Sequence, residues 1–191
     1  MNSFRLLLLY LLFWSSSNQN LQGVALVSQA FCLDLNEGFN KTFSDSIEVI
    51  VFLSETCPIC RQSTKSLNML AEKFNKQGIV FKGVFPNSYI STADTRKIFA
   101  KKYKINFSLI PDPGYKITDA LQASVTPEVF IRHMYTGKVV YQGKIDNMFE
   151  EVGKRRQVVT EYYVEDALNK LLQGKKPAIA YTDAIGCFIT R

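Results

Sequence analysis

The chain has 191 residues, of which 47% are apolar and 21% are charged. This is the composition of an ordinary globular protein and is long enough for one domain with a sizeable core. The net charge of +6 comes from scattered basic residues that are not interleaved with aromatic ones. This pattern argues against a nucleic-acid-binding protein and favours solvated basic faces.

The N-terminal residues 1–22 predict a secretory signal peptide. Arg5 precedes an unbroken apolar run from Leu6 to Trp14, and a small polar segment follows. The run has nine residues, whereas a membrane-spanning helix needs about 20. We therefore expect an exported protein with cleavage between Ser15 and Gly23. An uncleaved N-terminal anchor is the alternative.

The rest of the chain alternates between strand and helix patterns. Gly78 and Gly174 follow two of the helices, as is typical of helix ends. The pattern predicts an α/β domain whose mixed sheet is parallel where helices cross over and antiparallel at a hairpin. The expected elements are a first strand within 31–43, strands 47–54, 79–85, 106–110, 128–134 and 139–143, and helices 58–75, 93–103, 116–123 and 160–172.

The pair Cys57 and Cys60 is the most informative feature of the sequence. It follows the buried strand pattern directly and opens the helix pattern 58–75. At a helix N-terminus, unpaired backbone N–H groups and the helix dipole favour a thiolate, which is the species that attacks a disulfide. Pro58 is well tolerated in a first helical turn. Cys57 is thus the expected nucleophile and Cys60 the buried resolving cysteine.

The sequence resembles a thioredoxin-fold protein, in particular the exported redoxins grouped with alkyl hydroperoxide reductase and thiol-specific antioxidant proteins. The resemblance rests on Cys57-Pro-Ile-Cys60, on the segment Ser124-Val-Thr-Pro127, and on the hairpin that follows. It implies a thioredoxin-like domain over 31–174, with a redoxin-type insertion between the Cys-x-x-Cys helix and a cis-proline. Residues 175–191 would form a C-terminal tail.

The same resemblance implies roles for Thr126 and Pro127. Pro127 would be the cis-proline that lies against the Cys-x-x-Cys, and the Thr126 backbone would bind an incoming peptide. Two departures from the family pattern stand out. Val51 occupies the place of the buried acid of thioredoxins, and Ile50 replaces the proline of peroxidatic redoxins, although Ser54 matches their hydroxyl position.

Several other residues are candidates for supporting roles. Arg61 adds a positive charge that would favour the thiolate, although most such arginines are solvated. Glu128 either shuttles protons or faces solvent. His133, the one histidine of the chain, is expected to be a structural residue and not a catalyst.

Two further cysteines lie outside the motif. Cys187 follows a glycine in the apolar tail and is expected to be a third redox thiol, a disulfide partner of Cys32 or an inert buried thiol. Export would place all four cysteines in a compartment that permits disulfides.

The sequence therefore predicts an exported, periplasmic or extracytoplasmic thiol–disulfide oxidoreductase. Its partners would be protein disulfides or dithiols and an electron donor, with no organic cofactor, no metal, no nucleic acid and no stable membrane insertion. Two alternatives stay open. One is a thiol-dependent peroxidase, an antioxidant that uses Cys57. The other is a copper-binding protein that is not an enzyme and uses Cys57, Cys60 and His133. Covalent haem is excluded, because its motif requires histidine where Arg61 stands.

Overall fold

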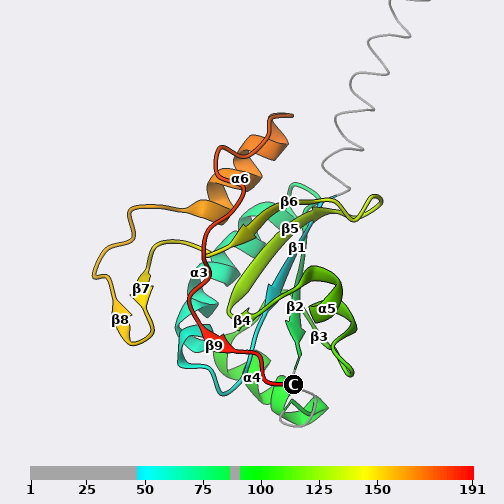
Figure 1. The fold of residues 1–191 in the computed structure, drawn as a ribbon, viewed down its shortest axis with the longest axis vertical. Coiled ribbons are helices and arrows are strands. Elements are labelled where there is room, and N and C mark those ends of the chain that lie inside the picture. Colours follow the sequence, from blue (N-terminus) through cyan, green and yellow to red (C-terminus); the bar gives the residue numbers. More distant parts are fainter. Residues whose placement is uncertain (1–46, 87–90) are drawn as a thin grey trace, which may run out of the picture. The chain divides into compact units, whose positions relative to one another are not determined.

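The computed structural model describes residues 47–86 and 91–191. Its centre is a five-stranded sheet in the order β3-β2-β1-β5-β6 (Figure 1). The strands of this sheet are β1 (Ile47–Phe52), β2 (Val80–Phe85), β3 (Ser108–Pro111), β5 (Glu128–His133) and β6 (Val139–Gly143). The helices are α3 (Pro58–Asn75), α4 (Ala93–Tyr103), α5 (Lys116–Leu121) and α6 (Tyr163–Leu172).

The sheet is mixed, as the sequence predicts. Strand β2 pairs in parallel with both β1 and β3, and α3 and α4 make the two crossovers. Strand β5 pairs antiparallel with β1 and with β6, so the expected hairpin is present. This order and direction of strands confirm the thioredoxin-like α/β fold, with α4 and β3 between the Cys-x-x-Cys helix and the cis-proline.

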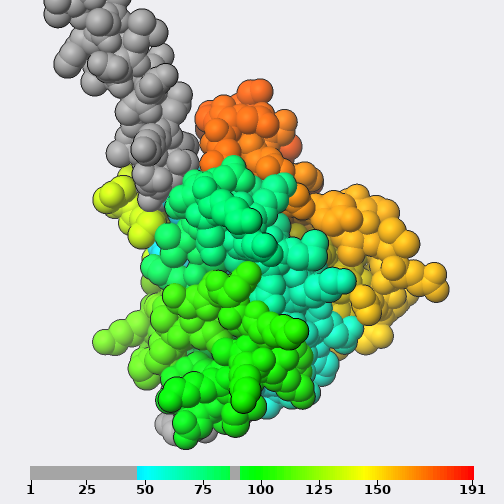
Figure 2. Space-filling model, turned by 180° about the vertical axis from the view of Figure 1, so that it is seen from behind, coloured from blue at the N-terminus to red at the C-terminus, as the bar shows by residue number. Residues whose placement is uncertain are grey.

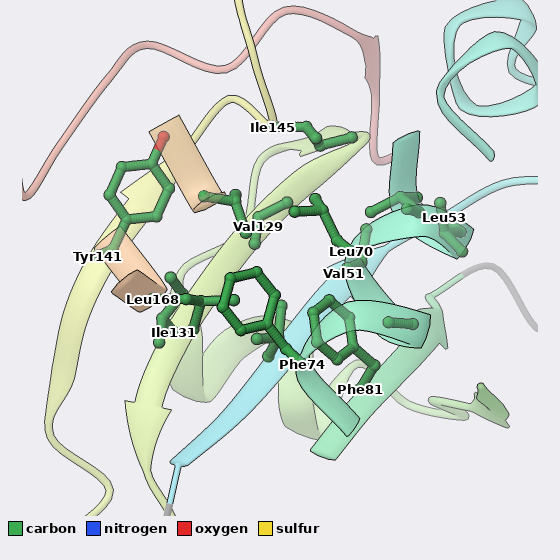
Figure 3. Packing of buried hydrophobic residues seen from close by; sticks show 14 of the residues in the cluster. Val51, Leu53, Leu70, Phe74, Phe81, Val129, Ile131, Tyr141, Ile145 and Leu168 are labelled. Atoms are coloured by element: carbon green, nitrogen blue, oxygen red, sulfur yellow. The ribbon is translucent and has the colours of Figure 1, made fainter. Parts of the chain in front are cut away.

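Strand β1 lies in the middle of the sheet and is buried along its whole length. Alternate side chains face opposite layers, because successive residues of a strand point to opposite faces. Val49 and Val51 pack with the buried faces of α3 and α6, and Figure 3 shows Phe74 and Leu168 within this larger cluster. Phe52 packs on the other face, in a smaller cluster with residues of α5.

The predicted helices 58–75 and 93–103 have identical bounds in the structure, as α3 and α4. Helix α3 begins at Pro58 and ends at Asn75, and α4 begins after a capping box in which the Thr92 hydroxyl accepts from the amide of Thr95. On the face seen in Figure 2, teal α3 and green α4 form much of the surface beside orange α6. The segment with β7 (Phe149–Glu151) and β8 (Lys154–Arg155) extends from the side of this face.

The sequence did not predict four short strands: β7 and β8, together with β4 (Val125–Thr126) and β9 (Cys187–Phe188). The predicted signal peptide, the first strand within 31–43 and Cys32 lie outside the described residues. Among the described residues, no helix is both long and apolar enough to span a membrane. The division into a domain at 31–174 and a tail at 175–191 stays a prediction.

Candidate active site

The site begins where β1 ends. After Phe52, a short turn leads to Cys57, which is the N-cap residue of α3 with extended backbone angles. Pro58 occupies the first turn of the helix, where its missing N–H breaks no helical hydrogen bond. No side chain caps this helix end. The backbone amides at the start of α3 are therefore available to a negative charge on Cys57.

Hydrogen bonds within the turn fix its shape. The Cys57 amide donates to the Ser54 carbonyl (3.3 Å), and the Thr56 amide donates to the Ser54 hydroxyl (3.3 Å). The Ser54 hydroxyl also bonds to that of Thr56 at 3.0 Å. Arg61 donates from Nε to the carbonyl of Glu55 at 2.8 Å, so it holds the turn in place. The hydroxyl of Ser54 thus contacts both the backbone amide and the hydroxyl of Thr56 within the turn.

Cys60 lies one helical turn further on and is fully buried. Its sulfur accepts a hydrogen bond from the Ser54 amide at 3.4 Å. Val51, at the position of the thioredoxin acid, is also fully buried. The chain therefore has an apolar side chain at the position where the acid would accept the proton of the resolving thiol.

The segment that contains Thr126 and Pro127 faces the cysteines. The resemblance implied a cis bond before Pro127, and the Thr126–Pro127 bond is cis. The Cys57 sulfur lies 3.1 Å from the Thr126 carbonyl oxygen, although 69 positions separate the two residues. This contact brings the predicted nucleophile against the predicted peptide-binding backbone.

Glu128 follows the cis-proline and is 3% exposed, so it does not face solvent. One carboxylate oxygen accepts from the Ser124 amide at 2.9 Å, and the other accepts from Nε2 of Gln142 at 2.8 Å. Both oxygens are thus engaged in holding the Thr126–Pro127 segment to β6. This arrangement favours a positioning role over the proton shuttle considered from the sequence.

Cys187 is the third cysteine of the site. It lies in β9, which pairs antiparallel with β4 so that Cys187 is opposite Thr126. Its thiol donates to the Cys57 sulfur at 2.9 Å. The structure therefore brings together Cys57, Cys60, Thr126, Pro127 and Cys187, which the sequence names only as separate candidates.

The hydrogen bonds around Cys57 favour its thiolate. The thiol of Cys60 contributes most, and the thiol of Cys187 and the amides of both residues add to it. Together they outweigh burial and lower the pKa of Cys57 to about 4. Burial and the neighbouring Cys57 charge raise the pKa of Cys60 well above its ordinary value. The pair thus divides into an acidic thiol and a thiol that keeps its proton, which is the division expected of the predicted nucleophile and resolving cysteine.

The third cysteine also keeps its proton in the reduced protein. Burial, followed by the hydrogen bond and charge of Cys57, raises the pKa of Cys187 to about 11. Cys187 is therefore a hydrogen-bond donor to the Cys57 thiolate as long as Cys57 is reduced.

The copper alternative requires His133 near the cysteines. Strand register places His133 opposite Ile47, at the start of β1, whereas Cys57 follows the other end of this strand. Six residues of extended chain separate the two ends by roughly 16 Å, so His133 cannot join Cys57 as a ligand. Across the described ranges, no group of three or more His, Cys, Asp or Glu side chains is arranged to hold a metal ion.

The contribution of the tail to the site was largely missed from the sequence. Cys187 was a candidate thiol, but the pairing of β9 with β4 had no sequence signal. The one available hint was Gly186. A Cβ atom at Gly186 would lie 2.1 Å from the Thr126 carbonyl oxygen, so this approach of the two backbones requires glycine.

The fold and the site together define a thioredoxin-like protein with a Cys-x-x-Cys pair at a helix N-terminus, opposite a cis-proline. Comparison with protein families is more specific, because the model of the AhpC/TSA family matches residues 29–146. The chain belongs to this family. The search of curated proteins found no significant match.

Three solved structures agree with the thioredoxin-like fold. A hypothetical protein from Sinorhizobium meliloti 1021 superposes with a TM-score of 0.67 and 24% identity, covering 78% of this chain and 81% of its own. An uncharacterized conserved protein from Geobacillus kaustophilus has a TM-score of 0.67 and 25% identity, and the match covers 77% of this chain and 78% of that protein. A thioredoxin-like protein solved in its oxidized form has a TM-score of 0.52 and 17% identity, and the match covers 69% of this chain and 80% of that protein.

Proposed function

We propose that this chain is an exported thiol–disulfide oxidoreductase that acts through the Cys57–Cys60 couple. The observation that carries the proposal is the position of Cys57. It caps α3, its pKa is lowered to about 4, and its sulfur touches the backbone of Thr126 beside the cis-proline. A nucleophilic sulfur next to an edge of backbone that can bind a peptide suits reactions with protein disulfides.

The proposed reaction has two exchange steps. The Cys57 thiolate attacks one sulfur of a substrate disulfide, and the other substrate sulfur leaves as a thiolate. Cys60 then loses its proton and attacks Cys57, which releases the second substrate thiol and leaves a Cys57–Cys60 disulfide. The substrate is reduced by two electrons, the chain is oxidised by two, and an external dithiol restores it. The same steps in reverse oxidise a substrate dithiol.

Substitution of each cysteine tests these roles. Cys57→Ser should abolish the reduction of a protein disulfide, whereas Cys60→Ser, combined with Cys187→Ser so that the neighbouring thiol cannot attack Cys57, should accumulate a mixed disulfide with the substrate, visible by mass spectrometry. A Cys57→Ser protein with wild-type turnover would overturn the proposal. Hydrogen peroxide consumed at a comparable rate with a thiol reductant would instead favour the antioxidant alternative.

The reduction potential of the couple decides the direction of electron flow. Equilibration against glutathione should give a reduction potential of about −270 mV if the protein is a thioredoxin-like reductant. It should give about −120 mV if the protein is an oxidant that introduces disulfides. Absence of any reversible Cys57–Cys60 couple would exclude the oxidoreductase and make copper(I) binding by the two thiols the next hypothesis to test.

Export is part of the proposal and rests on the sequence of residues 1–22. Cell fractionation after expression in a bacterium, followed by N-terminal sequencing of the recovered protein, tests it. Cleavage between Ser15 and Gly23 in an extracytoplasmic fraction is the expected result. An intact N-terminus in the membrane fraction would favour the uncleaved anchor.

A further inference from the structure

The C-terminal tail returns to the active site after α6. Figure 1 shows it in red, passing from the end of α6 to β9 beside β4. On the way it attaches to the edge of β6 by two backbone hydrogen bonds. The Gln142 backbone N–H donates to the Ala180 carbonyl (2.9 Å), and the Thr182 backbone N–H donates to the Gln142 carbonyl (3.0 Å). The tail is thus held to the sheet before it reaches the cysteines.

At the site, the tail binds the backbone that an incoming peptide would use. Val125 is opposite Phe188 and Thr126 is opposite Cys187 in the β4–β9 ladder. The Ile189 amide extends the contact by donating to the Ser124 carbonyl at 3.0 Å. Extended peptides bind other proteins in this way, by adding a strand to a free edge. The tail therefore occupies the position of a substrate strand and places a cysteine next to the nucleophile.

The tail and an external substrate cannot occupy this position together. Cys57 is 1% exposed, so its sulfur is not accessible to a second protein while the tail is in place. The far end of the tail lies largely at the surface, where the Tyr115 hydroxyl donates to the Thr190 carbonyl at 3.0 Å. Phe188 is 83% exposed, and the terminal ion pair of Arg191 with Asp119 is largely solvated. Solvated ion pairs contribute little to stability, so this pair does little to hold the tail against β4.

We propose that residues 185–189 are a displaceable, tethered substrate strand, and that Cys187 exchanges with the Cys57–Cys60 disulfide. The proposal rests on the Cys57–Cys60 couple of the proposed function. In the exchange, the Cys187 thiol loses its proton and attacks the Cys57 sulfur, and the Cys57–Cys60 bond breaks. The electron pair goes to Cys60, which takes up a proton. One disulfide and one thiol are present before and after, so no further oxidant is needed.

Disulfide mapping of the full chain tests the exchange. Cys32 is replaced by serine in every protein compared, and the chain is oxidised with oxidised glutathione and acid-quenched. Trypsin then gives peptides 42–61 and 176–191, which contain the three cysteines. We expect a fraction of the protein to show these two peptides joined. Detection of Cys57–Cys60 alone, with Cys187 free, would overturn the proposal and leave the proposed function intact. Absence of both disulfides would overturn the proposed function as well.

Displacement of the tail is tested with Gly186→Val. Its side chain would collide with the Thr126 carbonyl, so the variant should hold the tail away from β4. In the reduced protein we expect alkylation of Cys57 to be at least tenfold faster than in the wild type, and the joined peptides to disappear after oxidation. Ala178→Val is the matched control, because it places the same side chain at an exposed position of the tail.

Disulfide mapping and the alkylation rate of Cys57 together decide the proposal. Equal alkylation rates of Cys57 in the wild type and in Gly186→Val would show that the tail does not cover the site. Circular dichroism and the melting temperature verify that Gly186→Val is folded. If it does not fold, the joined peptide in the Cys32→Ser protein still decides whether Cys187 exchanges with the couple.

Discussion

The sulfur atoms of Cys57 and Cys187 lie 2.9 Å apart, although 130 positions separate the two residues in the sequence. A disulfide bond measures about 2.05 Å, so a shift of roughly 1 Å is enough to join them. The contact depends on the β4–β9 pairing, which aligns Cys187 with Thr126. The surroundings of the Cys57 sulfur are therefore coupled to the position of the tail.

Titration of the Cys57 thiolate should give a midpoint near its pKa of about 4. Thiolate absorbance in the ultraviolet, measured on the reduced protein from acid to neutral pH, tests this. Cys60→Ala should raise the midpoint most, since the Cys60 hydrogen bond contributes most, and Cys187→Ala should raise it less. A midpoint close to 9.0, the ordinary cysteine value, in the wild type would contradict the assignment of Cys57 as an activated nucleophile.

Stability of the reduced protein should also depend on this group. The pKa of Cys57 is lower in the folded state, so the folded protein binds fewer protons than the unfolded chain between about pH 4 and pH 9. The contribution of Cys57 to the free energy of unfolding is complete above its pKa in the unfolded state. It is lost as the pH falls through its pKa in the folded state. Denaturant unfolding should show a steeper loss of stability between pH 9 and pH 4 for the wild type than for Cys57→Ser.

Glu48 should stabilise the sheet through its two ion pairs. It is 2% exposed and accepts from Lys82 and from Arg132, each at 2.7 Å. Burial would raise the pKa of Glu48, but these hydrogen bonds outweigh it and lower the value below the ordinary 4.5. Glu48→Gln should cost about 1–3 kcal/mol at neutral pH, because it leaves two cations poorly paired.

The Glu48 contribution is present above pH 4.5 and is lost as the pH falls through the lowered pKa. In the oxidised protein Cys57 does not titrate. There, the difference in the free energy of unfolding between the wild type and Glu48→Gln should therefore shrink as the pH falls into the acid range. Glu72→Gln is the control, since Glu72 is 70% exposed in its pair with Lys76. Equal losses from the two substitutions at neutral pH would contradict the prediction.

Phe74→Ala should destabilise the domain by about 3–5 kcal/mol, because it leaves a cavity in the main core. Phe74 is fully buried among side chains from the sheet and α6 (Figure 3). Met69→Ala in the same helix removes a side chain that is 61% exposed and should change the stability by less than about 0.5 kcal/mol. Chemical denaturation of both variants makes the comparison. A small effect at Phe74 would mean that α3 packs loosely.

Glu128→Gln should lower stability by about 1 kcal/mol, because an amide cannot accept the hydrogen bonds of both Ser124 and Gln142 as the carboxylate does. As a positioning residue, Glu128 should leave the pH profile of turnover unchanged. The pH dependence of kcat/KM for a protein disulfide tests this. A lost ionisation in the variant would restore the proton shuttle considered from the sequence.

Local patterns were sufficient to predict much of the fold. Helix α3 has Pro58 at its start and an apolar face at helical spacing, and β1 and β2 are largely apolar runs with one charged residue each. The two-residue strands β4 and β9 are too short for any periodic signal, and their pairing joins segments 61 positions apart. This pairing depends on tertiary contacts. The Cys-x-x-Cys motif could therefore be predicted from the sequence, whereas the pairing that brings the tail to Cys57 could not.

The short tether from α6 to Cys187 has a kinetic consequence. Linking two groups in one chain makes their encounter intramolecular, with an effective concentration on the order of millimolar for a flexible linker. A free thiol or a substrate cysteine at micromolar concentration would meet Cys57 far less often than Cys187 does. Only partners that bind with additional affinity elsewhere on the surface would compete well. Selectivity would thus arise from competition with the chain's own cysteine, and the internal exchange should proceed at a rate independent of protein concentration.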